Sequence, residues 1–225
     1  MSAGRRATHV IFDMDGVLLD TERLYTEATQ RIVGRFGKTF DWSVKADMIG
    51  RPAADSARHL VEALALPITP EEYLAERAAL FETLMPTADA RPGARALVER
   101  LAAAGVPQAV ATSSGQRLLG LKTARHHDWF RHFACIVCGD DPRVERGKPA
   151  PDIFLVAAAV LGAEPARCVV VEDAPAGVAA ARAAGMRVVA APDPAMDRRR
   201  YADADLVVDD LGGLTVAALL SPASA

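Results

Sequence analysis

The sequence predicts an α/β protein with a parallel sheet at its core and a helical module inserted after the first strand. Short β-branched runs alternate with alanine-rich helical segments through most of the chain, whereas residues 20–88 show no convincing strand pattern. The runs are almost continuously apolar, which is typical of strands covered by helices on both faces. The predicted strands cover residues 10–12, 109–111, 136–137, 169–171, 188–190 and 206–208.

Three helices between these strands have clear ends. They cover residues 94–104, 152–161 and 175–184, and each is followed by a glycine: Gly105, Gly162 and Gly185. Glycine is favoured just after a helix because it tolerates the left-handed conformation there. Alternating strands and helices predict parallel strands joined by right-handed crossovers.

The inserted module is predicted from two helical patterns. Residues 21–36 are amphipathic, with an apolar face formed by Leu24, Ala28, Ile32 and Phe36. A second helix begins with Thr69 as its N-cap, Pro70 in its first turn and Glu72 closing a capping box, and runs to about residue 84.

A linker at residues 86–93 then returns the chain to the sheet. We therefore expect residues 1–19 and 89–225 to form the core and residues 20–88 to form a lid over the end of the first strand.

Composition narrows the possible partners. The 225 residues are 51% hydrophobic and 24% charged, with a formal net charge of −3 and no basic stripe suited to nucleic acid. Residues 198–200 are three arginines that we expect on an exposed helix face or turn. No apolar stretch is long enough for a membrane span or a secretion signal. We expect a cytoplasmic monomer with neither nucleic acid nor a membrane as partner.

The cysteines give no sign of a disulfide framework, because only three occur: Cys135, Cys138 and Cys168. Cys135 and Cys138 have the spacing of some metal and redox sites. They lie in a predicted strand with no second Cys or His pair at zinc spacing, so we favour a packing role.

Two carboxylates follow the first strand directly. Asp13 and Asp15 are two residues apart, so in extended backbone their side chains point the same way. This end of a parallel strand is where open α/β sheets bind ligands. Gly16 lets the backbone turn sharply there. Two like charges so close need a cation or a proton between them, which indicates a chemical site.

Three later segments strengthen this interpretation. Thr112 and Ser113 end another strand, where hydroxyls and backbone amides suit a phosphate. Lys148 lies in a loop before a helix and supplies a positive charge, and Glu172 and Asp173 end a third strand. If the sheet brings these ends together, four acids face one lysine. Such a cluster requires a hard divalent cation, and Mg²⁺ is the usual partner of phosphates.

Each feature alone also has an ordinary explanation: a helix cap, a solvated lysine, or polar residues at a strand end. Their shared position at one edge of the sheet favours the chemical interpretation.

The strand-end residues resemble the four motifs of the haloacid dehalogenase-like (HAD) superfamily, which here are Asp13-x-Asp15-Gly16, Thr112, Lys148 and Glu172-Asp173. Residues 12–22, 147–154 and 171–178 resemble its β-phosphoglucomutase-like branch, and the likeness spans about residues 8–215. Residues 21–25, 122–126 and 139–142 are similar to the pseudouridine-5′-phosphatase group.

The resemblance implies a Rossmann-like core with an all-helical cap inserted after the first strand. Asp13 would attack the substrate phosphorus and form an aspartyl-phosphate intermediate. Asp15 would protonate the leaving oxygen and then take a proton from the attacking water. Thr112 and the Ser113 amide would hold the phosphoryl oxygens, and Lys148 would neutralise charge on Asp13 and the phosphate.

The resemblance also implies a Mg²⁺ site. Its ligands would be Asp13, the main-chain carbonyl of Asp15, and Asp173, with Glu172 binding directly or through water. Gly16 would shape the turn beneath the cap. The implied function is Mg²⁺-dependent hydrolysis of a small phosphomonoester, such as a sugar phosphate, a nucleotide-like compound or pseudouridine 5′-phosphate.

Two other functions are open on the same scaffold. Phosphosugar mutases of this branch carry a histidine where this chain has Tyr25 and an arginine near Ala53, where the nearest candidate is Arg51. Both departures favour a phosphatase. A non-catalytic phosphate-binding or interaction protein is disfavoured because every catalytic position holds a competent residue.

The substrate's leaving group should meet the cap. Tyr25, Trp42, Met48 and Arg51 are the candidates for this contact, with Arg51 as a substrate-binding residue, although each also suits the cap core or its surface. We expect His126 and His127 to be surface residues at a helix end.

Overall fold

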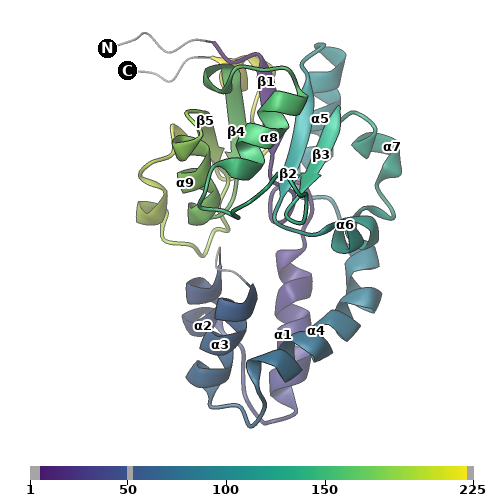
Figure 1. Ribbon diagram of the computed structural model, residues 1–225, viewed down its shortest axis with the longest axis vertical. Coiled ribbons are helices and arrows are strands. Elements are labelled where there is room, and N and C mark those ends of the chain that lie inside the picture. Colours follow the sequence, from purple (N-terminus) through teal and green to yellow (C-terminus); the bar gives the residue numbers. More distant parts are fainter. Residues whose placement is uncertain (1–5, 50–52, 222–225) are drawn as a thin grey trace.

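A six-stranded parallel sheet forms the core of the computed structural model, which describes residues 6–49 and 53–221 (Figure 1). The strand order is β3-β2-β1-β4-β5-β6. The strands are β1 (His9–Phe12), β2 (Gln108–Thr112), β3 (Cys135–Cys138), β4 (Cys168–Glu172), β5 (Arg187–Ala190) and β6 (Leu206–Val207). The predicted fold class is confirmed, and the sixth strand is one residue shorter than expected.

Strand β1 lies in the middle of the sheet, and the strand order reverses on either side of it. It pairs with β2 on one side and β4 on the other, both in parallel. The chain therefore builds outward in one direction as far as β3 and in the other as far as β6. A crevice opens beyond the carboxyl ends of the strands where the order reverses, which is the usual ligand site of such sheets.

Helices cover both faces of the sheet. Val10 and Phe12 of β1 pack in one apolar cluster, with α5 (Ala94–Ala103), α7 (His127–Phe130) and α10 (Val216–Leu220). Ile11 packs in a second cluster on the opposite face, with α8 (Asp152–Val160) and α9 (Pro175–Ala183). Alternate residues of one strand thus serve two cores, which explains why the strands are apolar throughout.

The inserted segment folds into helices below the sheet (Figure 1). These are α1 (Glu22–Gly34), α2 (Trp42–Met48), α3 (Ala53–Leu64) and α4 (Pro70–Leu84), followed by a 3-10 turn at Met85–Thr87. Ile32, Val44, Leu60 and Tyr73 join them in a separate apolar core. We call this segment the cap.

The helix ends of the cap differ in how well the sequence predicted them. The capping box at Thr69 is present: its hydroxyl accepts the Glu72 amide at 3.1 Å, and the Glu72 carboxylate accepts the Thr69 amide at 2.7 Å. The first helix covers Glu22–Gly34, slightly less than the predicted residues 21–36, and Thr21 at its N-cap position makes no side-chain capping bond. The Thr21 hydroxyl donates to Asp15 at 2.6 Å, because a buried carboxylate competes for it.

The chain enters and leaves the cap through a narrow neck. The amide of Asp20 donates to the carbonyl of Asp89 at 2.8 Å, and the amide of Arg91 donates to the carbonyl of Leu18 at 2.9 Å. These bonds join the two connections side by side. They support a cap boundary near residues 19–20 and 88–89, which stays a prediction.

The arginine run and the cysteines lie where the sequence predicts them. The three arginines at residues 198–200 are exposed in a short 3-10 helix, as predicted. All three cysteines lie in strands of the sheet and are unpaired. Within residues 6–49 and 53–221, none of the helices combines the length and apolarity needed to cross a membrane.

Candidate active site

A cavity of about 460 Å³ lies between the carboxyl edge of the sheet and the cap. Asp13, Ser113, Lys148 and Asp173 line it from the core. The cap lines it with hydroxyl, charged and apolar side chains, namely Glu22, Tyr25, Thr26, Thr29, Phe40, Lys45, Met48, Ile49, Ala53, Ser56, Arg77 and Phe81. A ligand here would therefore touch strand-end acids on one side and the cap on the other.

Lys148 connects two acids at the floor of this cavity. Its Nζ donates to Asp13 Oδ1 and to Glu172 Oε1, each at 2.6 Å, and to the carbonyl of Ala111 at 3.3 Å. The three charged side chains are 7%, 8% and 1% exposed, respectively. Charge-assisted bonds in such surroundings are strong, so the three groups hold one another in place.

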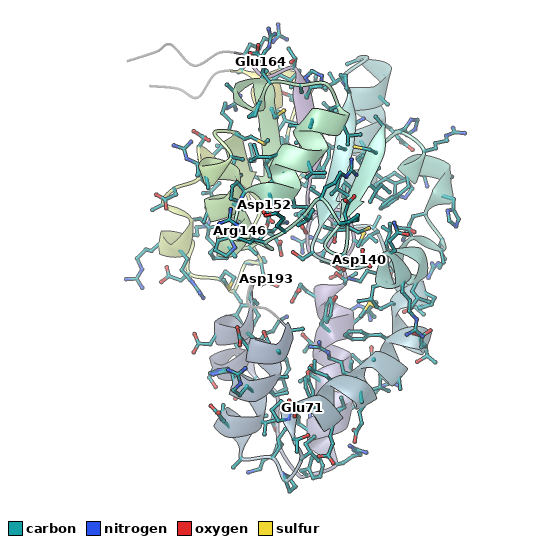
Figure 2. The ribbon with its side chains drawn as sticks, in the orientation of Figure 1. Glu71, Asp140, Arg146, Asp152, Glu164 and Asp193 are labelled. Carbon is teal, nitrogen blue, oxygen red and sulfur yellow. The ribbon has the colours of Figure 1, made fainter. Side chains whose placement is uncertain are left out.

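The loop that carries Lys148 is held in place by the carboxylate of Asp152. Asp152, the first residue of α8, accepts from the backbone amide of Arg146 at 3.0 Å and from its guanidinium at 3.2 Å. Figure 2 shows Arg146 and Asp152 close together between the sheet and the cap. This clasp fixes both ends of the segment and so presents Lys148 to the cavity.

Asp140 fixes the neighbouring turn, after β3. Its carboxylate accepts the Gln116 amide at 3.0 and 3.2 Å, at the start of α6 (Gln116–Thr123). Figure 2 places Asp140 at the same junction of sheet and cap. Ser113 and Ser114, which line the cavity, belong to the turn that this contact secures.

The acids around Lys148 carry more negative charge than one lysine offsets. Burial raises the pKa of Asp13 above its usual range, against the effect of Lys148 and with the help of Glu172. Burial, followed by the charges of Glu172 and Asp13, likewise raises the pKa of Asp173 well above its usual range. An additional cation would favour the charged form of both carboxylates.

The carboxylate of Asp173 is a candidate ligand for such a cation, and it lies close against the turn at Gly16. Among the described residues, no group donates a hydrogen bond to the Asp173 carboxylate. Gly16 has a φ of 74°, and a Cβ atom there would lie 2.1 Å from Asp173 Oδ2. Only glycine allows the turn and the carboxylate to approach so closely.

The donor set fits Mg²⁺, which takes oxygen ligands and commonly binds through one or two carboxylates. Within the described parts of the chain, no three His, Cys, Asp or Glu side chains converge as metal ligands. Glu172 is engaged elsewhere, since its Oε2 accepts the amides of Asp173 and Ala174 at 2.8 Å. The side chains left as candidate ligands are the Asp13 and Asp173 carboxylates, and the family resemblance adds the main-chain carbonyl of Asp15 as an expected ligand.

The Asp15 carboxylate faces a different set of donors. Its Oδ1 accepts from Lys122 Nζ at 2.5 Å and from the Thr21 hydroxyl at 2.6 Å. Its Oδ2 accepts from the Ser114 hydroxyl at 2.9 Å. Although burial opposes it, Lys122 lowers the pKa of Asp15 below its usual value. Asp13 and Asp15 both line the cavity, but each is held by its own lysine.

Lys122 and Ser114 were missed as candidate site residues from sequence. Lys122 resembles an ordinary exposed helix lysine, yet its side chain is 0% exposed. The one signal available was that residues 122–126 belong to a stretch with a family resemblance. Ser114 follows the predicted phosphate-binding pair directly and lines the cavity.

Thr112 is not among the residues that line the cavity. It is fully buried behind the cavity wall, and its Oγ1 accepts the Ser114 amide at 3.1 Å. The same hydroxyl is 3.4 Å from Asp15 Oδ2. In this structure, Thr112 shapes the turn, while Ser113 and Ser114 face the cavity.

Two of the four cap candidates line the cavity, Tyr25 and Met48. Trp42 does not, because its indole Nε1 donates to the carbonyl of Ala195, outside the cap, at 2.9 Å. Arg51 lies outside the described residues. Sequence reasoning also missed Arg77, which lines the cavity and lies 5.3 Å from the ring centroids of Tyr73 and of Phe81.

The expectation for His126 was wrong, while His127 is exposed as predicted. The His126 ring is buried: Nε2 lies 2.8 Å from the carbonyl of Ala88, and Nδ1 accepts the Trp129 indole at 3.2 Å. It therefore joins α7 to the end of the cap segment. The sequence shows two histidines at the start of a helix, but it does not show that the end of the cap segment packs against His126.

Comparison with known proteins agrees with this geometry. The model of the haloacid dehalogenase-like hydrolase family matches residues 7–185. The chain is 47% identical over 210 residues to "Probable pseudouridine-5′-phosphatase" of Drosophila melanogaster, covering 92% of this chain and 91% of the relative. It is 45% identical over 217 residues to (DL)-glycerol-3-phosphatase 2 of Arabidopsis thaliana, covering 94% and 90%.

A solved structure extends the comparison to the whole fold. It is a HAD family hydrolase from Deinococcus radiodurans R1 with bound phosphate and sodium, 29% identical, with a TM-score of 0.78. The match covers 99% of this chain and 100% of that one. The sheet order, the acids at the end of β1 and the family match lead to one conclusion: the chain belongs to the haloacid dehalogenase-like hydrolase family.

Proposed function

We propose that this chain is a Mg²⁺-dependent phosphatase of small phosphorylated metabolites and acts as a monomer. The observation that carries the proposal is the buried Asp13–Lys148 pair at the floor of a cavity closed by the cap. A carboxylate held beside a fixed positive charge can attack phosphorus while the lysine offsets the charge that accumulates. Relatives at 45% and 47% identity carry phosphatase names.

The proposed reaction has two steps. An Asp13 carboxylate oxygen bonds to phosphorus as the bond to the leaving oxygen breaks. Asp15 donates to that oxygen a proton that it must take up as substrate binds, since Lys122 favours its ionised form. Water then attacks the phosphorus of the aspartyl phosphate, Asp15 accepts a proton from the water, and the bond between phosphorus and the Asp13 oxygen breaks. The products are an alcohol and inorganic phosphate, and Asp13 is restored.

The surrounding residues would hold the phosphoryl group. Ser113, through its amide, and Lys148 would bind its oxygens, with Thr112 fixing the turn from behind. Asp13, Asp173 and the Asp15 carbonyl would hold Mg²⁺, with Glu172 supporting the site through Lys148 and the Asp173 amide. When bound, Mg²⁺ supplies positive charge that offsets the phosphate and the acids.

The substrate is proposed to be a monophosphate whose leaving group is rich in hydroxyl or other oxygen atoms. The cap wall offers Glu22, Lys45 and Arg77 beside apolar side chains. Lys45 and Glu22 form an ion pair at 3.5 Å, whereas no ion pair joins Arg77 to an acid within the described residues. Glycerol 3-phosphate and pseudouridine 5′-phosphate, suggested by the relatives' names, are therefore the first substrates to test.

The test is phosphate release with Mg²⁺ from these two compounds and a panel of hexose phosphates, together with a mutase assay on the sugars. We expect release of inorganic phosphate with at least one monophosphate and no positional transfer of phosphate. Isomerisation without net release would identify a mutase instead. Binding of phosphate compounds with no turnover across the panel would identify a non-catalytic protein.

A further inference from the structure

A second buried lysine, Lys122, has no part in the chemistry described so far. It lies near the end of α6, in the core, and its side chain is 0% exposed. Its Nζ donates to Asp15 Oδ1 at 2.5 Å, to Ser114 Oγ at 2.7 Å and to the phenol oxygen of Tyr25 at 2.9 Å. These three bonds use all three protons of the ammonium group, so its position is fully determined.

We infer that Lys122 is a positioning residue that sets the orientation of Asp15 and connects it to the cap. The inference rests on the proposed function, in which Asp15 transfers the proton of the leaving oxygen. A general acid must lie within hydrogen-bond reach of the atom it protonates. Lys122 is the charged donor to Asp15, and it also orients Ser114, which donates to the other carboxylate oxygen at 2.9 Å.

The connection to the cap passes through Tyr25 of α1. The Tyr25 ring lies 5.0 Å from Lys122 Nζ and packs edge-to-face on Phe81 of α4, with ring centroids 4.9 Å apart. Tyr25 and Phe81 both line the cavity on the side where the leaving group would lie. Lys122 therefore touches the acid, the turn after β2 and the leaving-group wall at once.

A purely structural role would look different in kinetics. If Lys122 only compensated a buried charge, its loss would reduce the amount of folded enzyme and affect every substrate equally. If it positions the acid, its loss lowers kcat/KM in proportion to how much the leaving group needs a proton, because kcat/KM reports only the steps up to formation of the aspartyl phosphate. An alkyl phosphate needs protonation of its oxygen, whereas p-nitrophenyl phosphate releases a stable anion without it.

The experiment compares Lys122→Met and Lys122→Arg with wild type on glycerol 3-phosphate, or the best alkyl phosphate of the panel, and on p-nitrophenyl phosphate. For Lys122→Met we expect kcat/KM to fall about 100-fold on the alkyl substrate, the scale of general acid–base catalysis, with most of the loss in kcat rather than in KM. On p-nitrophenyl phosphate we expect a much smaller loss.

Lys122→Arg keeps a positive charge at the buried position and provides a second test if the Met variant does not fold. Its planar guanidinium cannot reproduce the three ammonium bonds, so we expect an intermediate loss with the same preference for the aryl substrate. Lys38→Met, at an exposed lysine of the cap, is the matched control and should leave both rates unchanged.

Equal losses of kcat/KM on both substrates, or unchanged kcat/KM in folded Lys122 variants, would overturn the inference. Such a result would leave the proposed function intact if wild type releases phosphate. Absence of release by wild type would instead count against the proposed function itself, so the two failures are distinguishable.

Discussion

At the scale of single residues, the site is built from two buried lysine–aspartate pairs. Lys148 holds Asp13 at 2.6 Å, and Lys122 holds Asp15 at 2.5 Å. Although burial opposes it, the charges of Asp13 and Glu172 raise the pKa of Lys148 above its usual value. Two neighbouring acids thus acquire different surroundings. Burial raises the pKa of the proposed nucleophile Asp13, so its role requires the additional cation, which favours the charged form.

Asp13→Asn should remove turnover while the protein stays folded. The amide has nearly the shape of the carboxylate but cannot act as the nucleophile, so kcat should fall by several orders of magnitude. Lys148 keeps its bond to Glu172, which preserves the local structure. Phosphate release and circular dichroism measure the two outcomes.

Asp20→Asn is the matched control for that substitution. Asp20 is a nearby acid whose side chain is 37% exposed and whose ion pair with Arg23 spans 3.9 Å, so its loss should change little. Near-normal hydrolysis by Asp13→Asn would contradict the covalent mechanism.

Asp173→Ala should raise the Mg²⁺ concentration needed for half-maximal activity by at least about tenfold. The substitution removes one of the two carboxylates assigned to the metal and leaves the Asp13–Lys148 pair in place. A chelator should stop wild-type activity, and added Mg²⁺ should restore it. An unchanged Mg²⁺ titration, or full activity in excess chelator, would disprove the assigned site.

At the scale of elements, the chemistry depends on how closely helices approach the strand ends. Gly177 lies in the first turns of α9, and a Cβ atom there would fall 1.7 Å from Glu172 Oε1. That oxygen cannot move freely, because it accepts Lys148 Nζ while Oε2 accepts two backbone amides. A glycine inside a helix thus allows the Glu172–Lys148 contact to form.

Gly177→Ala should therefore reduce kcat and thermal stability together, because the new methyl group displaces Glu172 and with it Lys148. Gly120→Ala is the control: Gly120 is also helical, in α6, and a Cβ atom there meets nothing within 4 Å. That control should stabilise the fold by about 0.5–1 kcal/mol, since alanine favours the helix. The unfolding temperature and the rate of phosphate release are measured for both variants. If Gly177→Ala and Gly120→Ala have the same unfolding temperature and the same kcat, the steric argument is wrong.

At the scale of the whole molecule, the cap rests on the core at contacts distant from the neck. Trp42 Nε1 donates to the carbonyl of Ala195 at 2.9 Å, and the guanidinium of Arg200 donates to the carbonyl of Ala46 at 3.0 Å. Both bonds join α2 to the segment that follows β5. They hold the cap against the core on the side opposite α4 and so help to close the cavity.

Trp42→Phe should weaken this closure, because phenylalanine preserves an aromatic ring but cannot donate the bond to Ala195. One net hydrogen bond is worth about 0.5–1.5 kcal/mol, so we expect KM to rise by about 2- to 10-fold with a smaller change in kcat. Steady-state kinetics on the best substrate measures this. A fall in kcat at constant KM would show that Trp42 serves the chemistry rather than closure.

Much of this architecture follows from local pattern. Apolar runs, helix-ending glycines and the capping box at Thr69 predict a parallel sheet with a helical insertion, because they depend on periodicity and on chain direction. Since carboxyl ends of parallel strands share one edge, the proximity of Asp13, Lys148 and Glu172 was also predictable. Their chemical roles stay predictions.

Tertiary structure alone decided which side chains became neighbours across long separations. Lys122 and Asp15 are 107 positions apart, and Trp42 and Ala195 are 153 apart. His126 is buried because the end of the cap segment packs on it, and Thr112 turns inward because the Ser114 amide requires an acceptor. The order of residues along the chain determines the hydrophobic period of each helix or strand and which of its faces is apolar. The environment of a polar side chain depends instead on which distant element covers it. That element takes its place only when the helices and the sheet pack together.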